Sequence, residues 1–183
     1  MQKWRRVEPT KVQKVGYRVI VSKTYEMPNG QTAVFDTTSA EGQRFIATIA
    51  LTADGKVIIA EQFRPGPEKI MQELPGGYVD EGESSEQAAR RELLEESGYE
   101  AGEIISLGTT YKDAFSNAST EYFLAMNCRY IGAPTTHEAE EHVEVKLITV
   151  DKLIQNAKSD KMTDGIAVLL AYDKLLELKG AIK

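Results

Sequence analysis

Three glutamates on a single predicted helix face constrain this chain more than any other feature. The stretch Gly77–Tyr99 reads GYVDEGESSEQAARRELLEESGY, and in it Glu92, Glu95 and Glu96 stand at positions i, i+3 and i+4. At about 100° per residue, these side chains project from one face of a helix. Carboxylates held this close repel one another unless a cation lies among them. A hard divalent ion such as Mg²⁺ or Mn²⁺ prefers such oxygen ligands.

Local signals predict where this helix begins and ends. Ser84 or Ser85 can accept a hydrogen bond from an amide of the first turn, and Gly98 suits the left-handed residue that ends a helix. The turn Leu74-Pro75-Gly76-Gly77 precedes the loop that leads into the helix. Backbone carbonyls of such a turn can complete a metal shell.

A solvated acidic face is the alternative interpretation of the three glutamates, since most charge runs are of that kind. Arg91 can pair with Glu95 at i+4, but its position does not predict that it neutralises the whole cluster. The loop before the helix adds further acids, Asp80, Glu81 and Glu83. Together these features favour a metal site over a solvated face.

The same stretch resembles the Nudix box, G-x5-E-x7-R-E-U-x-E-E-x-G-U, in which U is a bulky apolar residue. Leu93 and Tyr99 fill the apolar positions, and every fixed position is filled, by Gly77, Glu83, Arg91, Glu92, Glu95, Glu96 and Gly98. The resemblance implies an α/β fold, a Nudix-type α/β/α sandwich with a mixed sheet between helices. Residues 45–183 would form this hydrolase domain.

Residues 1–44 are predicted to form an N-terminal antiparallel β extension. Together with Glu61-Gln62-Phe63-Arg64 and Glu73-Leu74-Pro75, this extension resembles the ADP-ribose and nucleotide-sugar pyrophosphatase branch. In such enzymes the extension builds a homodimer and part of the substrate pocket. The resemblance therefore implies a homodimer whose residues 1–44 contribute to both.

Alternation of apolar residues and turn signals predict the remaining elements. In the extension, Val12–Tyr25 reads as extended chain, followed by a turn at Met27-Pro28-Asn29-Gly30 and a return strand. In the second domain Thr52-Ala53-Asp54-Gly55 predicts a hairpin turn. Further strands are expected at 104–112, 121–128 and 143–149. Helices are expected at 151–158 and at 164–178, the second of them capped by Asp164.

The resemblance also implies a role for each residue of the site. Two or more Mg²⁺ ions, with Mn²⁺ as a substitute, would be held by three glutamates and one backbone carbonyl, those of Glu92, Glu95, Glu96 and Gly76. Glu92 and Glu96 would be catalytic residues because they would bind these ions. Arg91 would orient the glutamates, and Glu83 would support the loop.

Arg64 and Glu73 are the expected substrate-binding residues. Arg64 ends a predicted strand beside a Pro/Gly-rich loop, where a guanidinium suits bidentate phosphate recognition; a plain surface arginine is the alternative. A general base is expected in the acidic loop at 138–141, with Glu141 favoured over Glu140, unless that loop is merely solvated.

The function that follows is Mg²⁺-dependent hydrolysis of the pyrophosphate bond of a nucleoside diphosphate linked to another group. ADP-ribose or a nucleotide sugar would give a nucleoside monophosphate and a sugar phosphate. Two features depart from the ADP-ribose branch: the loop Lys112–Thr120 has no proline, and the turn before the helix has glycine at Gly76. GDP-mannose therefore remains a possible substrate. Triphosphate or dinucleoside polyphosphate hydrolysis, and a non-enzymatic ligand sensor, are the alternatives.

Composition limits the partners. A net charge of −6 disfavours a nucleic-acid polymer, because phosphate binding needs a basic surface. No apolar run has membrane-spanning length, and the lone Cys128 excludes an internal disulfide and fits a reducing cytoplasm as a small buried residue. Trp4, the single tryptophan, is expected to pack down the N-terminus, with nucleobase stacking or a dimer interface as alternatives.

Overall fold

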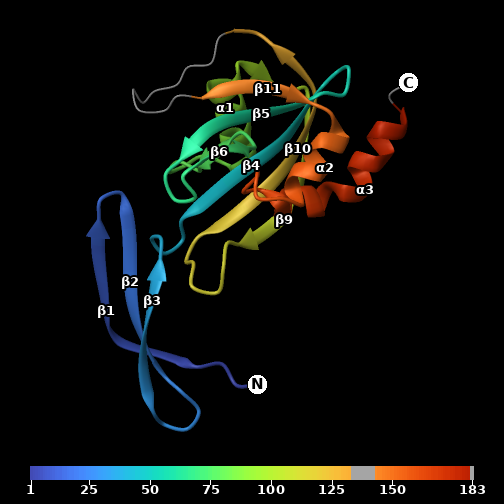
Figure 1. Ribbon diagram of the computed structural model, residues 1–183. Coiled ribbons are helices and arrows are strands. Elements are labelled where there is room, and N and C mark those ends of the chain that lie inside the picture. Colours follow the sequence, from blue (N-terminus) through green and yellow to red (C-terminus); the bar gives the residue numbers. More distant parts are fainter. Residues whose placement is uncertain (133–142, 182–183) are drawn as a thin grey trace. The chain divides into compact units, whose positions relative to one another are not determined.

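The computed structural model of the chain describes residues 1–132 and 143–181, which fall into two compact units. The first unit comprises Met1–Arg44 and Thr110–Thr120, and the second comprises Phe45–Thr109 and Glu121–Lys183. Figure 1 shows the first unit as a small blue sheet and the second as a larger sheet with its helices.

The first unit is an antiparallel sheet with the strand order β1-β2-β3. Its strands are β1 (Arg5–Val15), β2 (Arg18–Glu26) and β3 (Thr32–Thr38). The prediction of one extended run over Val12–Tyr25 is wrong, because the chain reverses at Gly16, whose φ of 59° needs little conformational energy only in glycine. The predicted turn after β2 is confirmed, since the Gly30 amide donates to the Met27 carbonyl at 2.9 Å.

The segment Thr110–Thr120 belongs to the first unit through contacts with the end of β3. The Thr38 amide donates to the Phe115 carbonyl, and the Asn117 amide donates to the Thr38 carbonyl, both at 2.8 Å. The Asn117 side chain also donates to Thr37 Oγ1 at 2.9 Å. A loop between two strands of the larger sheet is therefore fastened to the end of β3.

The second unit is built on a larger mixed sheet. Within the described residues its strand order is β11-β5-β4-β10-β8, with β6 paired to β5, β7 to β4 and β9 to β10. The bounds are β4 Arg44–Thr52, β5 Val57–Arg64, β6 Lys69–Glu73, β7 Gly76–Tyr78, β8 Tyr99–Glu100, β9 Glu103–Tyr111, β10 Ser119–Tyr130 and β11 Glu144–Ile148.

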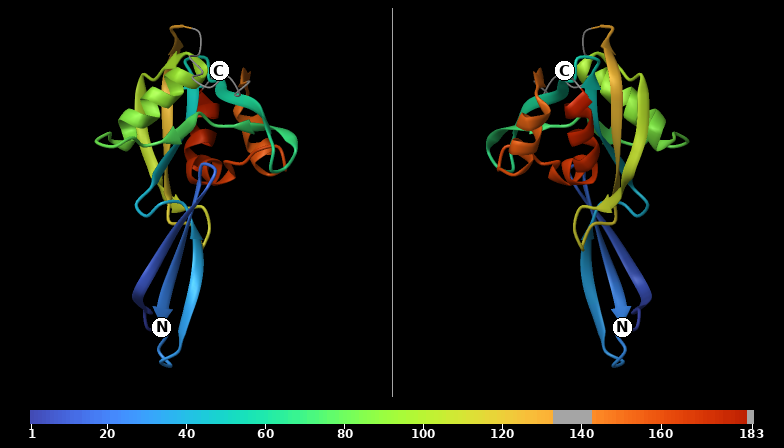
Figure 2. Two further views of the ribbon diagram at one scale, coloured as in Figure 1. Left: turned by 90° about the vertical axis from the view of Figure 1, so that its left-hand side faces the viewer. Right: turned by 90° about the vertical axis from the view of Figure 1, so that its right-hand side faces the viewer.

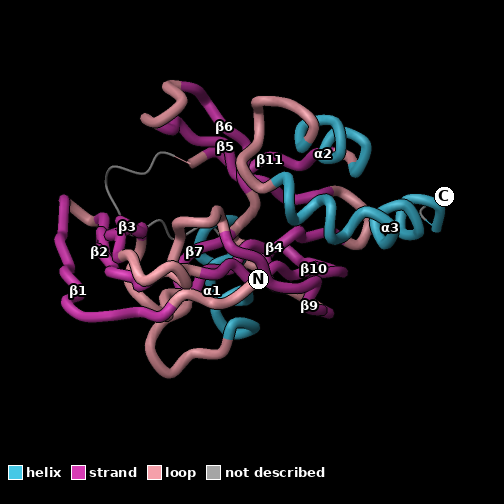
Figure 3. The backbone as a smooth tube through the Cα atoms, turned by 90° about the horizontal axis from the view of Figure 1, so that it is seen from below, coloured by secondary structure: helices cyan, strands magenta, loops and turns pink. Residues whose placement is uncertain are grey.

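Helices cover both faces of this sheet. They are α1 (Ser85–Ser97), α2 (Val150–Ala157) and α3 (Gly165–Ala181). Figure 2 shows α1 on one face and α2 with α3 on the other, and Figure 3 shows α2 and α3 side by side. This arrangement confirms the expected α/β/α sandwich.

Alternating side chains of β4 explain why helices pack on both faces. Ile49 and its odd-numbered neighbours pack with Leu153 of α2 and Leu175 of α3, whereas Ala50 packs with Leu93 of α1. Successive strand residues point to opposite faces, so an almost continuous apolar strand needs cover on both. The core therefore lies in two layers, one on each side of β4 and β5.

The local signals around α1 are confirmed in detail. Ser84 is the N-cap, and its hydroxyl and the side chain of Gln87 form a capping box. Gly98 ends the helix with a φ of 74°, and its amide donates to the Leu94 carbonyl at 2.8 Å. The Thr52–Gly55 hairpin turn is also confirmed, since β4 and β5 pair as antiparallel neighbours.

Thr48 of β4 carries a fully buried hydroxyl that has no hydrogen-bond partner among the described residues. An unsatisfied buried hydroxyl costs about 1–3 kcal/mol. We therefore expect Thr48→Val to raise the free energy of unfolding by about 1 kcal/mol, because a methyl replaces that hydroxyl. Urea unfolding of both proteins measures the difference, and a Thr48→Val chain less stable than the parent would contradict a partnerless hydroxyl.

Two remaining expectations concern Cys128 and membrane association. Cys128 is buried, as predicted, and burial raises the pKa of its thiol to about 11. Across the described part of the chain, the helices are too short or too polar to cross a lipid bilayer.

Candidate active site

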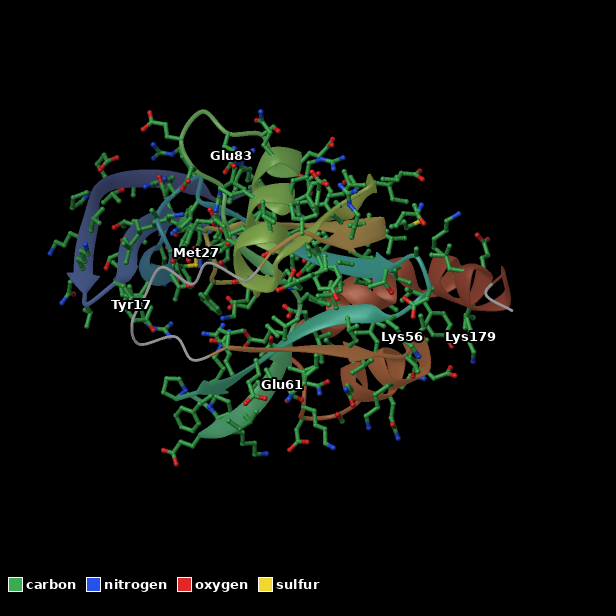
Figure 4. All side chains as sticks on the ribbon, turned by 90° about the horizontal axis from the view of Figure 1, so that it is seen from above. Tyr17, Met27, Lys56, Glu61, Glu83 and Lys179 are labelled. Atoms are coloured by element: carbon green, nitrogen blue, oxygen red, sulfur yellow. The ribbon has the colours of Figure 1, made fainter. Side chains whose placement is uncertain are left out.

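Arg91 joins the helix α1 to the loop that precedes it. Its guanidinium donates to both carboxylate oxygens of Glu83, each at 3.1 Å, and to the Tyr78 carbonyl at 3.0 Å. Figure 4 labels Glu83 on this loop, directly before α1. The hydrogen bond from Arg91 lowers the pKa of Glu83, so this carboxylate stays charged and the loop stays tied to the helix.

The same guanidinium also reaches two of the three helix glutamates. Arg91 Nη1 lies 2.8 Å from Glu92 Oε1 and 3.1 Å from Glu95 Oε2. The pairing with Glu95 follows the predicted i+4 spacing, whereas the contact with the adjacent Glu92 was not expected. Arg91 therefore relieves more of the carboxylate repulsion than the sequence predicts.

The third glutamate, Glu96, binds the glycine turn instead. Its Oε2 accepts from the Gly76 amide at 2.9 Å, while the preceding Pro75 carbonyl accepts from the Thr48 amide at 2.8 Å. The turn is thus held by α1 on one side and by β4 on the other. This places the backbone of Gly76 directly beside the carboxylate of Glu96.

Gly77 allows the helix to approach the turn closely. A Cβ added at Gly77 would lie 2.3 Å from Glu92 Oε1, and one added at Gly76 would lie 2.4 Å from the Ile46 carbonyl oxygen. Real Cβ atoms do not approach other atoms this closely. Glycine at both positions therefore forms a cradle in which the Glu92 carboxylate and β4 contact the turn backbone.

The donor set of this cradle fits a divalent cation. Glu92, Glu95 and Glu96 offer hard oxygen atoms from one helix face, next to the backbone of Gly76. Burial raises the pKa of Glu92 in spite of its contact with Arg91, so this carboxylate lacks part of the solvation that a cation could replace.

The side chains are not arranged around one point. Across residues 1–132 and 143–181, no three acidic, histidine or cysteine side chains converge on a position that could hold an ion. The contacts explain this, because Arg91 holds Glu92 and Glu95 while Glu96 accepts from the Gly76 amide. Rotation of the glutamate side chains alone, with the helix in place, would redirect these oxygens.

Arg64 and Glu73 lie together and contact each other. Arg64 Nε donates to Glu73 Oε1 at 2.7 Å, its Nη2 contacts Oε2, and Gln62 Nε2 donates to Oε2 at 3.0 Å. Ala60 pairs with Glu73 across β5 and β6. Since Ile58 on the same face of β5 packs with Leu93 of α1, the pair lies on the sheet face that carries α1.

The two candidates for the general base fall outside the described residues. Glu140 and Glu141 both belong to the segment 133–142, so their role stays a prediction. The three helix glutamates, Arg91 and the glycine turn are the predicted residues that the structure brings together.

The first unit contains an aromatic pocket of about 260 Å³. Trp4 packs on Phe35 as expected, with ring centroids 5.7 Å apart, and Tyr25 meets Phe35 edge-on at 6.1 Å. Phe115 and Lys3 complete the lining, together with Thr37 and Ala114. Trp4 remains 41% exposed, so packing leaves part of this residue open to a ligand.

Sequence reasoning missed Asp164 as a partner of the turn. Its Oδ2 accepts from the Leu74 amide at 3.0 Å, so the side chain predicted to cap α3 instead contacts the residue that opens the glycine turn. No short-range signal could have shown this, because the two residues are 90 positions apart. A polar residue before a helix normally predicts an N-cap.

Asp164 predicts a specific dependence of stability on pH. Burial, with the nearby charge of Glu73 as a smaller cause, raises the pKa of Asp164 to about 6. Asp164 therefore keeps its proton to a higher pH in the folded chain than in the unfolded chain. As a result the free energy of unfolding falls as pH rises from about 4 to about 6. The loss relative to Asp164→Asn should approach 3 kcal/mol as an upper estimate.

Urea unfolding of both proteins at several pH values measures this loss. The Asp164→Asn chain is the matched control, because its amide does not titrate in this range. A difference in unfolding free energy between the two proteins that stays constant from pH 4 to pH 7 would contradict the raised pKa of Asp164.

Similarity to known proteins covers the part of the chain that contains this site. The family model for the NUDIX domain matches residues 43–169. An ADP-ribose pyrophosphatase of Bacillus subtilis is 30% identical over 160 residues, which cover 86% of this chain and 84% of that protein. A methanol dehydrogenase activator of Bacillus methanolicus is 30% identical over 161 residues, with the same coverage of each chain.

A solved structure described as an ADP compounds hydrolase has the same fold. It superposes with a TM-score of 0.82 over 97% of both chains, at 17% sequence identity. This likeness extends over both units of the chain, whereas the family model begins at residue 43.

Proposed function

The chain belongs to the NUDIX domain family, and we propose that it hydrolyses the pyrophosphate bond of ADP-ribose or a nucleotide sugar with the help of Mg²⁺. The observation that carries this proposal is the complete set of three helix glutamates beside a turn where only glycine fits: Arg91 contacts Glu92 and Glu95, and Glu96 accepts from the Gly76 amide. The substrate class is supported by the name of the Bacillus subtilis relative, which matches most of this chain.

The proposed reaction splits one phosphoanhydride bond. Water adds to one phosphorus, the bond from the bridging oxygen to that phosphorus breaks, and the bridging oxygen leaves with the other phosphate. A proton from the water is released to a base, for which Glu141 and then Glu140 stay the candidates. ADP-ribose would give AMP and ribose 5-phosphate.

Each residue of the site has a proposed role in this reaction. Glu92, Glu95 and Glu96, with the Gly76 carbonyl, would hold Mg²⁺, which when bound supplies positive charge for the diphosphate and for the attacking water. Arg91 orients Glu92 and Glu95, because one guanidinium contacts both and is itself fixed by Glu83.

Arg64 and Glu73 are proposed to position the substrate. The carboxylate of Glu73 contacts two nitrogen atoms of the Arg64 guanidinium, which fixes the plane of that group. A guanidinium fixed in this way suits a phosphate or sugar oxygen at the strand end. The role stays a proposal for both residues.

A phosphate-release screen tests the proposal. Each compound is incubated with the protein, Mg²⁺ and a phosphatase that acts only on the monoester products. The panel contains ADP-ribose, ADP-sugars, GDP-mannose and dinucleoside polyphosphates. Nucleoside triphosphates are assayed separately by nucleotide chromatography. We expect turnover of a diphosphate-linked compound that a chelator abolishes. Turnover of triphosphates alone would replace the substrate class, and Mn²⁺ binding without any turnover would favour the ligand-sensor alternative.

The aromatic pocket of the first unit is proposed to bind a nucleobase. Its lining of Trp4, Tyr25, Phe35 and Phe115 offers ring faces for stacking, and Lys3 offers a positive charge nearby. We expect AMP to quench the fluorescence of Trp4, the single tryptophan, and ribose 5-phosphate to leave it unchanged. Phe35→Leu should weaken the AMP effect by about tenfold in concentration, since stacking on an aromatic ring is worth about 1–3 kcal/mol. Identical responses to both ligands would contradict base binding.

We also propose a cytoplasmic homodimer formed through residues 1–44. Large apolar side chains stand exposed on the first unit, among them Val12, Val15, Tyr17 and Val34, each at least 57% exposed. Such a concentration of exposed apolar groups is typical of an interface. Sedimentation of the intact chain and of Val12→Asp measures this, and a monomer at micromolar concentration would contradict it. The lone Cys128 supports a reducing compartment.

A further inference from the structure

The outer edge of β6 is closed by the segment that leads into α3. β6 pairs with β5 along one side, where Glu73 lies opposite Ala60. Strand amides alternate in direction, so Gln72 and Leu74 donate away from β5. The Gln72 amide donates to the Lys161 carbonyl at 2.8 Å, and a parallel bridge joins Gln72 to Met162.

Asp164 supplies the next hydrogen bond of this edge with its side chain. After Met162 the chain turns into α3, where the Ala167 amide already donates to the Asp164 carbonyl at 3.0 Å. Within residues 1–132 and 143–181 the Leu74 amide therefore meets no main-chain carbonyl, and Asp164 Oδ2 accepts from it at 3.0 Å. A buried amide without an acceptor would cost free energy, which makes this contact structurally important.

Leu74 opens the turn that carries Gly76, and three hydrogen bonds anchor Leu74, Pro75 and Gly76 in addition to the pairing of β7 with β4. The Leu74 amide is held by Asp164, the Pro75 carbonyl by the Thr48 amide, and the Gly76 amide by Glu96. These anchors come from the start of α3, from β4 and from α1. The strand β4 and the helix α1 flank the turn. Of these three anchors, only Asp164 belongs to neither of them.

We propose that Asp164 is a positioning residue for the reaction, fixing Leu74 and thereby the direction of the Gly76 carbonyl. This inference rests on the proposed function, because it assigns Asp164 to the turn that would hold the metal ion. Pro75 follows Leu74 directly, and its ring fixes one backbone angle, which limits how far the chain between Leu74 and Gly76 can absorb a shift at Leu74. In this role Asp164 would act through Leu74 and would contact neither substrate nor metal.

The test is Mn²⁺ binding to Asp164→Ala in the absence of substrate, followed by electron paramagnetic resonance. We expect the dissociation constant for Mn²⁺ to rise about tenfold, as for other residues that orient metal ligands, and the Leu74 amide to exchange its hydrogen faster. Asp160→Ala is the matched control, because Asp160 binds Lys69 at the other end of the same edge and is exposed. It should leave both quantities within about twofold.

Asp164→Asn keeps the test decisive if the alanine variant fails to fold. Its neutral amide oxygen can still accept from Leu74 but does so less strongly than a carboxylate. We expect exchange at Leu74 to quicken and Mn²⁺ affinity to fall about threefold, together in the same protein. Faster exchange at Leu74 with unchanged Mn²⁺ affinity, in either folded variant, would overturn the inference.

The proposed function can fail separately. A parent chain that binds no Mn²⁺ and hydrolyses no diphosphate would overturn both the proposed function and the role of Asp164. A parent chain that binds Mn²⁺ and hydrolyses its substrate, beside an Asp164→Ala chain of equal Mn²⁺ affinity, would overturn the role of Asp164 alone.

Discussion

Glu96→Gln is expected to leave the protein folded and to lower kcat by about a thousandfold, which corresponds to about 4 kcal/mol of lost transition-state stabilisation. The amide oxygen of glutamine can still accept from the Gly76 amide, so the contact between α1 and the turn survives. The negative charge that would hold Mg²⁺ is lost. Steady-state hydrolysis at saturating Mg²⁺ measures kcat, and thermal unfolding reports the fold.

Glu86→Gln is the matched control for this variant. Glu86 lies in the first turn of the same helix, pairs with Arg90 and is exposed. The loss of an exposed i,i+4 pair costs only about 0.5 kcal/mol, so kcat should stay within twofold. A Glu96→Gln chain with near-parental turnover would remove Glu96 from the proposed metal ligands.

Gly77→Ala is expected to lower kcat/KM by about a hundredfold while the fold persists. The added Cβ would lie 2.3 Å from Glu92 Oε1, and because that atom is the end of a flexible side chain, the carboxylate moves and the backbone stays. Displaced by about 1 Å, Glu92 loses both its contact with Arg91 and its direction toward a metal ion. Kinetics with titrated Mg²⁺ should show a higher half-saturating Mg²⁺ concentration.

Gly76→Ala provides the contrast within the same turn. Its Cβ would meet the backbone carbonyl of Ile46 at 2.4 Å, and a strand backbone cannot move away as a side chain can. We expect this variant to lose about 2 kcal/mol or more of stability, as for other overpacked buried sites. If Gly77→Ala unfolds instead while Gly76→Ala stays stable, the described approach of Glu92 to the turn is wrong.

Local signals were sufficient to predict the central helix of the site. Ser84 and Gly98 mark its ends by side-chain and backbone chemistry that acts within four residues. The common face of Glu92, Glu95 and Glu96 follows from helix geometry alone. The hairpin at Thr52–Gly55 is likewise a short-range feature that was predicted correctly, whereas the sequence left the N-cap open between Ser84 and Ser85.

Contacts between distant segments could not be predicted in this way. β6 and β7 follow a stretch rich in proline and glycine, and they are strands only because β5 and β4 pair with them. The contact of Arg91 with Glu83 depends on how the loop folds back over the helix, eight residues away. Asp164 looks like a helix cap in sequence, and only its approach to Leu74 gives it another role.

Gly16 illustrates a different kind of failure. A local turn signal was present in the sequence there, but the β-branched residues around it were given more weight. The run Val12–Tyr25 is rich in β-branched residues, which favours one long strand. Gly16 and Tyr17 nevertheless form a tight reversal, because pairing β1 with β2 gains a ladder of hydrogen bonds that runs unbroken from Lys11 to Val15 on β1. A single glycine inside a strand pattern thus marked the turn.

Phosphorus-31 nuclear magnetic resonance of ADP-ribose with the protein and Mg²⁺ tests the central claim most directly. We predict that the two diphosphate signals disappear and that two phosphomonoester signals, those of AMP and ribose 5-phosphate, grow in equal amounts. A chelator should stop the conversion, and the Glu96→Gln chain should show almost none of it. Persistence of the diphosphate signals with ADP-ribose and with every nucleotide sugar, beside a folded protein loaded with Mg²⁺, would contradict the account.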